Sequence, residues 1–179
     1  MEYFIGIVPP QETLKKIYTF QKSFTSNRLP DIIEPHITVK TKNGLTEDCR
    51  WLQTITHIIE EYPRFVITLK GVDMFRDSVV ILRPEVSEEL IGLHKILYQA
   101  IQPNESDPGK QFYENHYFEA HITLGMVSWG MTNEELLCMR ERAVQELSHL
   151  PGFAVTFIRV YRQTQLTGPF NTFLDIPLL

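Results

Sequence analysis

Apolar and polar positions follow two different periods along this chain, one typical of helices and one typical of strands. Apolar residues recur every three or four positions in four segments, which predicts amphipathic helices over 14–24, 47–61, 90–101 and 133–148. Runs rich in β-branched and aromatic residues predict seven strands: 3–8, 36–40, 65–75, 78–82, 121–125, 153–162 and 172–177. This mixture predicts an α+β fold.

The same order of elements occurs twice, and a hexapeptide marks each copy. Residues 34–39 read Glu-Pro-His-Ile-Thr-Val, and about half the chain later residues 119–124 read Glu-Ala-His-Ile-Thr-Leu. A helix-like segment and then a strand-like run follow each copy. Because two copies are too few for a solenoid, we expect an internal duplication that folds as one bilobal domain over 1–179. Two mainly antiparallel sheets would face a central cleft, with the helices on the outside.

Each hexapeptide contains a His-x-Thr motif that places two polar side chains on one strand face. Alternate residues of a strand point to the same side, so His36 lies beside Thr38 and His121 beside Thr123. Two imidazoles across one cleft suit cleavage of a phosphodiester, in which one group takes a proton and another gives one. With a reference pKa of about 6.5, histidines can share these roles near neutral pH. The threonine hydroxyls can donate to the phosphoryl oxygens.

Other interpretations stay open at this point. The repeated strands could be purely structural, or the cleft could bind a nucleotide or RNA without catalysis. A metallohydrolase is the least favoured, because the chain has no HExxH sequence and neither motif has a second nearby ligand. Of the remaining histidines, His57, His94 and His149 fit surface or packing positions. His116 lies in the segment 102–118, which has no counterpart in the first half and is the best candidate for a mobile loop over a site.

At these residues the chain resembles the 2H phosphoesterase superfamily, which includes the RNA 2′,3′-cyclic phosphodiesterases, also called 2′-5′ RNA ligases. The two motifs, at 36–39 and 121–124, carry the resemblance, together with the opening strand and a closing strand that ends Ile-Pro-Leu at 176–178. It implies a phosphoric diester hydrolase with no metal or other cofactor. The substrate would be a 2′,3′-cyclic phosphate, or a related 2′-linked phosphoester, on an RNA end or a small nucleotide.

The resemblance also implies a role for each motif residue. His36 corresponds to the proton donor and His121 to the proton acceptor, with Thr38 and Thr123 on the phosphate. The two histidine labels reverse in the ligation direction. Nearness to the motif strands or to the long loop suggests further substrate contacts, with solvated surface as the other interpretation: Lys40, Arg83, Tyr113, Tyr161 and Arg162.

Composition and charge limit the class of protein and the compartment that we expect for this chain. With 179 residues, 43% of them hydrophobic, the chain can form a core without metals or disulfides. Its two cysteines, Cys49 and Cys138, lie far apart, which predicts reduced thiols in a cytoplasmic protein. No signal peptide or membrane span is expected. The net charge of −5 argues against a protein that coats long nucleic acid. We expect a monomer that engages one phosphate at a time.

Overall fold

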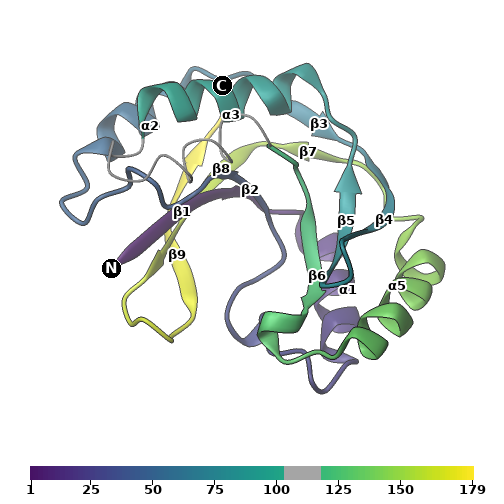
Figure 1. Ribbon diagram of the computed structural model, residues 1–179. Coiled ribbons are helices and arrows are strands. Elements are labelled where there is room, and N and C mark those ends of the chain that lie inside the picture. The colour runs from purple at the N-terminus through teal and green to yellow at the C-terminus, as the bar shows by residue number, and fades with distance from the viewer. Residues whose placement is uncertain (103–117) are drawn as a thin grey trace.

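The computed structural model describes residues 1–102 and 118–179, in which helices pack against a mainly antiparallel sheet (Figure 1). The α-helices of this part are α1 (Gln11–Lys22), α2 (Trp51–Glu60), α3 (Glu88–Ala100) and α5 (Asn133–Leu147), and η1 (Leu29–Asp31) and η2 (Val127–Trp129) are short 3₁₀ helices. The strands are β1 (Glu2–Ile7), β2 (Ile37–Lys40), β3 (Phe65–Ile67), β4 (Leu69–Phe75), β5 (Val79–Pro84), β6 (Ile122–Met126), β7 (Phe153–Val155), β8 (Phe157–Gln163) and β9 (Phe170–Pro177). The predicted α+β class is confirmed.

The large sheet takes strands from both halves of the chain. Its order is β4-β5-β6-β2-β1-β8-β9, and a second, small sheet consists of β3 and β7. The first-half strand β4 pairs with β5, which opens the second copy of the repeat, while β8 from the second copy pairs with β1 from the first. We refer to β4-β5-β6 and β2-β1-β8-β9 as the two lobes of the sheet. Each lobe contains strands from both copies of the repeat, and neither copy completes a lobe by itself.

The two lobes join at their motif strands. β2 and β6 pair antiparallel at one position, where Ile37 lies opposite Ile122. These isoleucines are the second residues of the two motifs, and both are fully buried, which is worth about 1.5–3 kcal/mol for each side chain. The expectation of two facing sheets is refined here, because the antiparallel strands of the two lobes form one continuous arch from β9 to β4 (Figure 1).

Two long runs that the sequence pattern predicts as single strands are each divided in two. The run 65–75 breaks at Thr68, and the run 153–162 breaks at Thr156. At each break the threonine carbonyl accepts a hydrogen bond from a backbone N–H outside the run, that of Glu85 (2.7 Å) or Leu178 (3.0 Å). The first part of each run then pairs in the small sheet, and the second part joins the large sheet.

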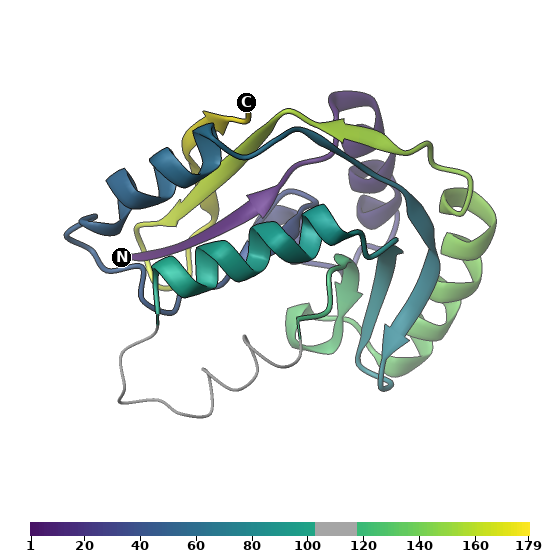
Figure 2. The same ribbon diagram turned by 90° about the horizontal axis from the view of Figure 1, so that it is seen from above.

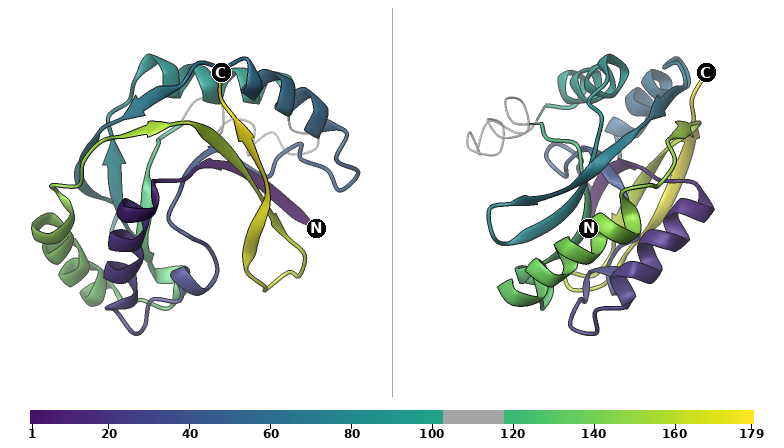
Figure 3. Two further views of the ribbon diagram at one scale, coloured as in Figure 1. Left: turned by 180° about the vertical axis from the view of Figure 1, so that it is seen from behind. Right: turned by 90° about the vertical axis from the view of Figure 1, so that its right-hand side faces the viewer.

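Helices cover the sheet in two groups (Figures 2 and 3). α2 and α3 contact each other, and they pack on β9 and β2 respectively, whereas α5 packs on β4, β5 and β6 and α1 contacts β6. Side-chain hydrogen bonds tie a helix to each motif strand. Gln21 of α1 donates to the carbonyl of Thr123 (2.9 Å), and Nδ1 of His94 in α3 lies 2.9 Å from the carbonyl of Val39. Each motif strand is thus held by a helix from the other half of the sequence.

Candidate active site

The histidines of the two motifs lie on the same face of the joined sheet. His36 immediately precedes β2 and His121 immediately precedes β6. Because Ile37 and Ile122 are opposite each other, antiparallel register brings Thr38 toward His121 and places His36 toward Thr123. The two imidazoles are near enough for His121 to lower the pKa of His36. The structure therefore brings the four motif side chains together around one point of the sheet.

Both imidazoles are anchored through the same ring nitrogen. Nδ1 of His36 lies 2.8 Å from the carbonyl oxygen of Glu34, and Nδ1 of His121 lies 2.6 Å from that of Glu119. A carbonyl oxygen can only accept, so Nδ1 carries the proton in each ring. Nε2 is then the nitrogen that can accept or give a proton, and both histidines present it in the same chemical state.

Burial disfavours the charged form of both rings. It lowers the pKa of His36 to about 4, although the hydrogen bond to the Glu34 carbonyl acts in the opposite direction. Burial also lowers the pKa of His121, against a similar hydrogen bond to Glu119. Both imidazoles are therefore neutral at pH 7 when no ligand is bound. A bound phosphate anion would favour the protonated form and so raise both pKa values.

His36 has an aromatic and ionic surrounding built from distant parts of the chain. Its ring lies 4.8 Å from that of Phe4 and 5.4 Å from that of Tyr161, and those two rings stack on each other at 4.4 Å. The Glu34 carboxylate accepts from the Tyr161 hydroxyl (2.8 Å) and from Nη1 of Arg159 (2.7 Å). Arg159 also donates through Nε and Nη2 to both carboxylate oxygens of Asp175, each at 2.6 Å. Apart from Glu34 itself, these partners lie on β1, β8 or β9.

The surrounding of His121 is more open. Its ring meets Phe75 of β4 edge to face at 4.8 Å. Arg83 of β5 donates to Asp73 through Nε (3.1 Å) and Nη2 (2.9 Å), but its Nη1 is 3.7 Å from the Glu119 carboxylate. The Glu119 side chain is 53% exposed, against 29% for Glu34. The equivalent glutamates of the two motifs therefore differ in how firmly they are held.

An apolar pocket of about 310 Å³ adjoins the first motif. Thr38 and His36 lie at its wall, and most of its lining is aromatic or aliphatic: Tyr3, Phe4, Leu29, Ile32, Ile33, Trp129 and Phe170. Thr41 and Lys42 complete the lining, and Lys42 pairs with Glu2 (2.6 Å). Neither His121 nor Thr123 lines this pocket. It therefore extends from the site toward the His36 side only.

The further contacts predicted from the sequence lie in different places. Arg83 and Tyr161 stand beside His121 and His36, but the Tyr161 hydroxyl is bound to Glu34. Arg162 pairs with Tyr3 in the β1–β8 ladder and lies over Phe173, on the sheet face opposite Tyr161, so it does not reach the histidine face.

The other two predicted contacts are Lys40 and Tyr113. Lys40 is fully buried and donates to the carbonyl of Asn43 (2.6 Å), in the loop after β2. Tyr113 and His116 are outside the described residues, as is nearly all of the predicted loop 102–118.

The remaining histidines and the cysteines agree with the simpler interpretations. His57 lies beside Glu61 (3.7 Å) with most of its side chain exposed, His149 is not buried, and the buried His94 stacks on Phe118 at 3.8 Å. Cys49 and Cys138 are free. In the described part of the chain, no group of three or more His, Cys, Asp or Glu side chains is arranged to hold a metal ion. No helix there is long and apolar enough to cross a membrane.

The sequence pattern did not reveal Arg159 and Asp175 as neighbours of the site. The available signal was the glutamate two residues before each histidine, since a repeated carboxylate next to a motif calls for a cationic partner. Which arginine supplies it depends on the pairing of β8 with β1, which the sequence pattern does not specify.

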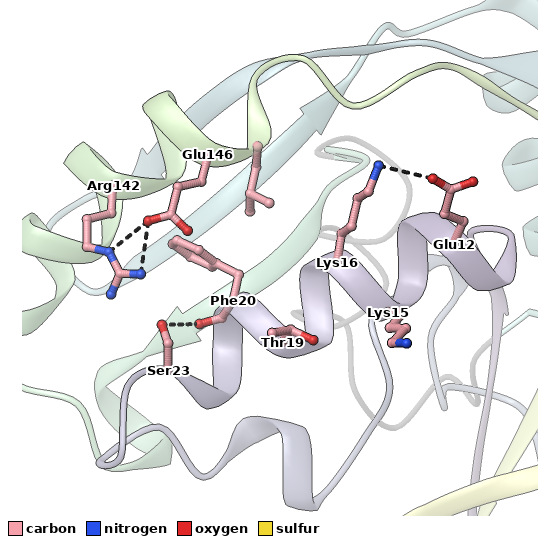
Figure 4. Close-up of a pocket in the computed structure, with 9 residues that line it drawn as sticks. Glu12, Lys15, Lys16, Thr19, Phe20, Ser23, Arg142 and Glu146 are labelled. Atoms are coloured by element: carbon pink, nitrogen blue, oxygen red, sulfur yellow. Dashed lines mark hydrogen bonds and ion pairs between the residues drawn. The ribbon is translucent and has the colours of Figure 1, made fainter.

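A second hollow lies between α1 and α5, on the outer side of the sheet (Figure 4). It measures about 580 Å³, and charged side chains line it. These charges pair within each helix, Lys16 with Glu12 (3.2 Å) and Arg142 with Glu146 (2.9 Å), and Arg142 also lies over Phe20. With Lys15, the fifth charged side chain of its lining, this groove has a formal net charge of +1, and it is separate from the histidine site.

Solved structures share this fold. The LigT protein of E. coli, in a crystal structure with 3′-AMP, aligns over 99% of this chain and 97% of its own, with 18% identity and a TM-score of 0.62. The protein TT0787 of Thermus thermophilus aligns over 99% and 98%, with 16% identity and a TM-score of 0.66. A structure described as a phosphoesterase aligns over 99% and 98%, with 18% identity and a TM-score of 0.62. No curated protein sequence matches the chain.

The comparison with family models gives the class, which is that of phosphoester-acting enzymes. A sequence model of the 2'-5' RNA ligase superfamily matches residues 9–165, which is most of the chain. The chain belongs to this superfamily. The resemblance to this family, from which the roles of the motif residues were predicted, is therefore confirmed as far as family membership goes.

Proposed function

We propose that the protein hydrolyses a 2′,3′-cyclic phosphate, or a related 2′-linked phosphoester, on RNA ends or small nucleotides, without a metal ion. One observation carries the proposal. Two imidazoles on one sheet face are both fixed through Nδ1, which leaves both Nε2 atoms for proton transfer. Cleavage of a phosphodiester requires two such groups, and positioned proton transfer contributes about 10²- to 10⁴-fold to the rate.

The reaction assigns one proton movement to each histidine. His121 accepts a proton from a water molecule as the water oxygen bonds to phosphorus. The bond from phosphorus to one ribose oxygen breaks, and His36 in its protonated form gives its proton to that oxygen. The product is a phosphomonoester, and exchange with solvent restores the two imidazoles. Thr38 and Thr123 donate to the non-bridging oxygens, where negative charge increases in the transition state.

The apolar pocket supports this assignment of roles. Because it adjoins His36 and not His121, a nucleoside that occupies it brings its ribose oxygens to the His36 side. The leaving oxygen then lies near the proton donor, and the attacking water lies near His121. The related E. coli LigT protein has been crystallised with 3′-AMP and with phosphate, which are ligands of the class proposed for this chain.

Turnover of 2′,3′-cyclic nucleotides by the purified protein tests the proposal. We expect activity in the presence of EDTA, and its loss in both His36→Ala and His121→Ala. His57→Ala is the matched control, since this histidine lies away from the site on α2 and should keep wild-type activity. Activity that survives both motif substitutions would refute the proposal. Saturable nucleotide binding without turnover would instead indicate a binding module, and loss of activity to a chelator would indicate a metallohydrolase.

The same proposal covers partners and setting. We infer a monomer that acts on one nucleotide or RNA end at a time in the cytoplasm and forms no coat on long nucleic acid. Gel filtration with light scattering checks the monomer. Competition by long RNA without phosphorylated ends checks the substrate preference, and strong inhibition by such RNA would contradict it.

A further inference from the structure

The carbonyl that orients His36 belongs to a residue outside the sheet ladders. Glu34 precedes β2, in a segment that is neither helix nor strand. Its carbonyl oxygen fixes the Nδ1 proton of His36, so any movement of residue 34 rotates the imidazole or releases its tautomer. The position of this carbonyl must therefore be fixed by something other than strand pairing.

The side chain of the same residue supplies that anchor. Its Oε1 atom accepts two hydrogen bonds, from Arg159 (2.7 Å) and from Tyr161 (2.8 Å), and both donors lie on β8. Charge-assisted bonds of this kind are short and about twice as strong as neutral ones. Tyr161 also contacts the His36 ring directly. One strand thus holds both ends of the segment from Glu34 to His36.

The donors are themselves fixed. Arg159 is bound to both oxygens of Asp175 on β9, and its side chain is only 17% exposed. Burial, with the adjacent Glu34 carboxylate, raises the pKa of Tyr161 well above its usual range, so its hydroxyl keeps its proton and stays a donor near neutral pH. We refer to Glu34, Arg159, Tyr161 and Asp175 as the Glu34 clamp.

We propose that the Glu34 clamp is the positioning device of this active site: Glu34 is a positioning residue that, held by Arg159 and Tyr161, fixes the tautomer and direction of His36. The clamp touches no reacting atom and acts only through the imidazole. This inference rests on the proposed function for its kinetic consequence. Its structural consequence, the fixed Nδ1–H tautomer of His36, does not depend on which substrate is used.

The second motif offers a matched comparison within the same chain. Glu119 occupies the equivalent position and also orients its histidine through the backbone carbonyl. Its carboxylate, however, is 53% exposed and 3.7 Å from Arg83. Removing the Glu119 side chain should therefore leave His121 in place, whereas removing that of Glu34 should release His36.

The experiment compares Glu34→Ala with Glu34→Gln, Tyr161→Phe and the control Glu119→Ala. In Glu34→Ala we expect kcat for a 2′,3′-cyclic nucleotide to fall about 10- to 100-fold with little change in KM, since a 1 Å misplacement of a reacting group can cost about 10² in rate. Glu34→Gln retains an oxygen acceptor and should restore most of the activity. Tyr161→Phe keeps the ring stacking and should have an intermediate effect, and Glu119→Ala should stay within about threefold of wild type.

Nitrogen-15 NMR of the histidine rings reports the tautomer of His36 directly. A loss of fold stability alone would not change this tautomer. We expect wild type and Glu34→Gln to show a single Nδ1–H tautomer for His36, and Glu34→Ala to show a mixture. Because Arg159 keeps its pairing with Asp175 in that variant, no unpaired charge is created and the fold should persist. An unchanged His36 tautomer in Glu34→Ala, or equal losses of kcat in Glu34→Ala and Glu119→Ala, would overturn the inference. If wild type cleaved no phosphoester at all, the proposed function would fail while the NMR comparison still decided the role of the clamp.

Discussion

His36 and His121 follow the same four-residue pattern, but the chain holds them differently. The glutamate before His36 accepts from Arg159 and Tyr161, and a stacked aromatic pair lies against the ring. The glutamate before His121 is largely exposed, and one edge-to-face phenylalanine meets that ring. A repeated motif therefore does not imply repeated surroundings. The apolar pocket adjoins His36, the more firmly enclosed of the two histidines. This is the arrangement expected if the substrate binds, and its leaving group is protonated, on the His36 side of the site.

The largest effects should come from the histidines themselves, and the leaving group should distinguish them. His36→Ala and His121→Ala should each slow hydrolysis of a 2′,3′-cyclic nucleotide by about 10²- to 10⁴-fold. With bis(4-nitrophenyl) phosphate, whose leaving group departs without a proton, the loss in His36→Ala should shrink to about tenfold or less. His121→Ala should stay equally impaired. Steady-state kinetics with both substrates provide the measurement, and the opposite pattern would mean that the two roles are exchanged.

Depressed histidine pKa values should move the pH optimum to the acid side. One imidazole must be protonated and the other neutral, and burial lowers both pKa values from 6.5 in the free protein, that of His36 to about 4. The profile of kcat/KM should be bell-shaped with its maximum below pH 6.5 and should fall about tenfold per pH unit on its basic side. The profile of kcat should lie at higher pH, because bound phosphate favours the protonated rings.

The lowered pKa of His36 also makes the free energy of unfolding depend on pH. Between pH 6.5 and about 4 the unfolded state binds more protons at His36 than the folded state, so the free energy of unfolding should decrease as the pH falls through this window. Urea unfolding of wild type and His36→Gln at several pH values checks this. A pH dependence that is identical in both proteins would show that His36 is not the group responsible.

A smaller effect on kcat should follow from adding a side-chain carbon at Gly6, which lies next to His36. Gly6 pairs with both Thr38 and Arg159 in the strand ladders. A Cβ at this position would lie 3.1 Å from the backbone carbonyl oxygen of Ile37 and 3.3 Å from both Cδ2 of His36 and Cε2 of Tyr161. The β2 backbone and the two rings would therefore have to move by a few tenths of an ångström. Gly6→Ala should lower kcat about tenfold, since a 1 Å misplacement can cost about 10². Gly168→Ala is the control and should retain wild-type kcat, because the three atoms nearest to its added Cβ all belong to Gln165 in the β8–β9 turn.

The smallest effect distinguishes the two arginines by stability. Arg159→Met leaves the partly buried Glu34 and Asp175 without their cation and should cost about 1.5–3 kcal/mol of unfolding free energy. Arg83→Met breaks a pair in which Asp73 is 52% exposed, and it should cost about 1 kcal/mol or less. Chemical denaturation measures both. Equal losses of unfolding free energy in the two variants would mean that arginine pairing supports the two motifs equally, which would contradict the difference between their surroundings.

The sequence was sufficient to predict the order of the helices and of the strand-rich runs, because each depends on local periodicity. The strand period places His36 with Thr38 on one face, and helical spacing predicts each of the four helices. It was not sufficient to predict the breaks at Thr68 and Thr156, where the threonine carbonyl accepts a hydrogen bond from a backbone N–H that lies outside the run.

The order in which the strands pair was not predicted either, and the Glu34 clamp depends on this order. Nothing in the local pattern indicates that β8 lies beside β1, so Arg159 and Tyr161 could not be assigned to His36. Arg162, one residue further, was expected near the substrate by its proximity in sequence. A shift of one position along a strand places its side chain on the opposite face.

The exchange of β4 and β8 between the lobes has a consequence for synthesis on the ribosome. β1 is synthesised before β8, which is one of its two neighbours in the sheet, and Asp175 of β9 completes the support of His36. Contacts between segments so far apart in sequence form slowly and cannot form until the later segment exists. His36 therefore acquires its working geometry only after β8 and β9 have been made, and a product truncated before them would contain the motif without its orientation.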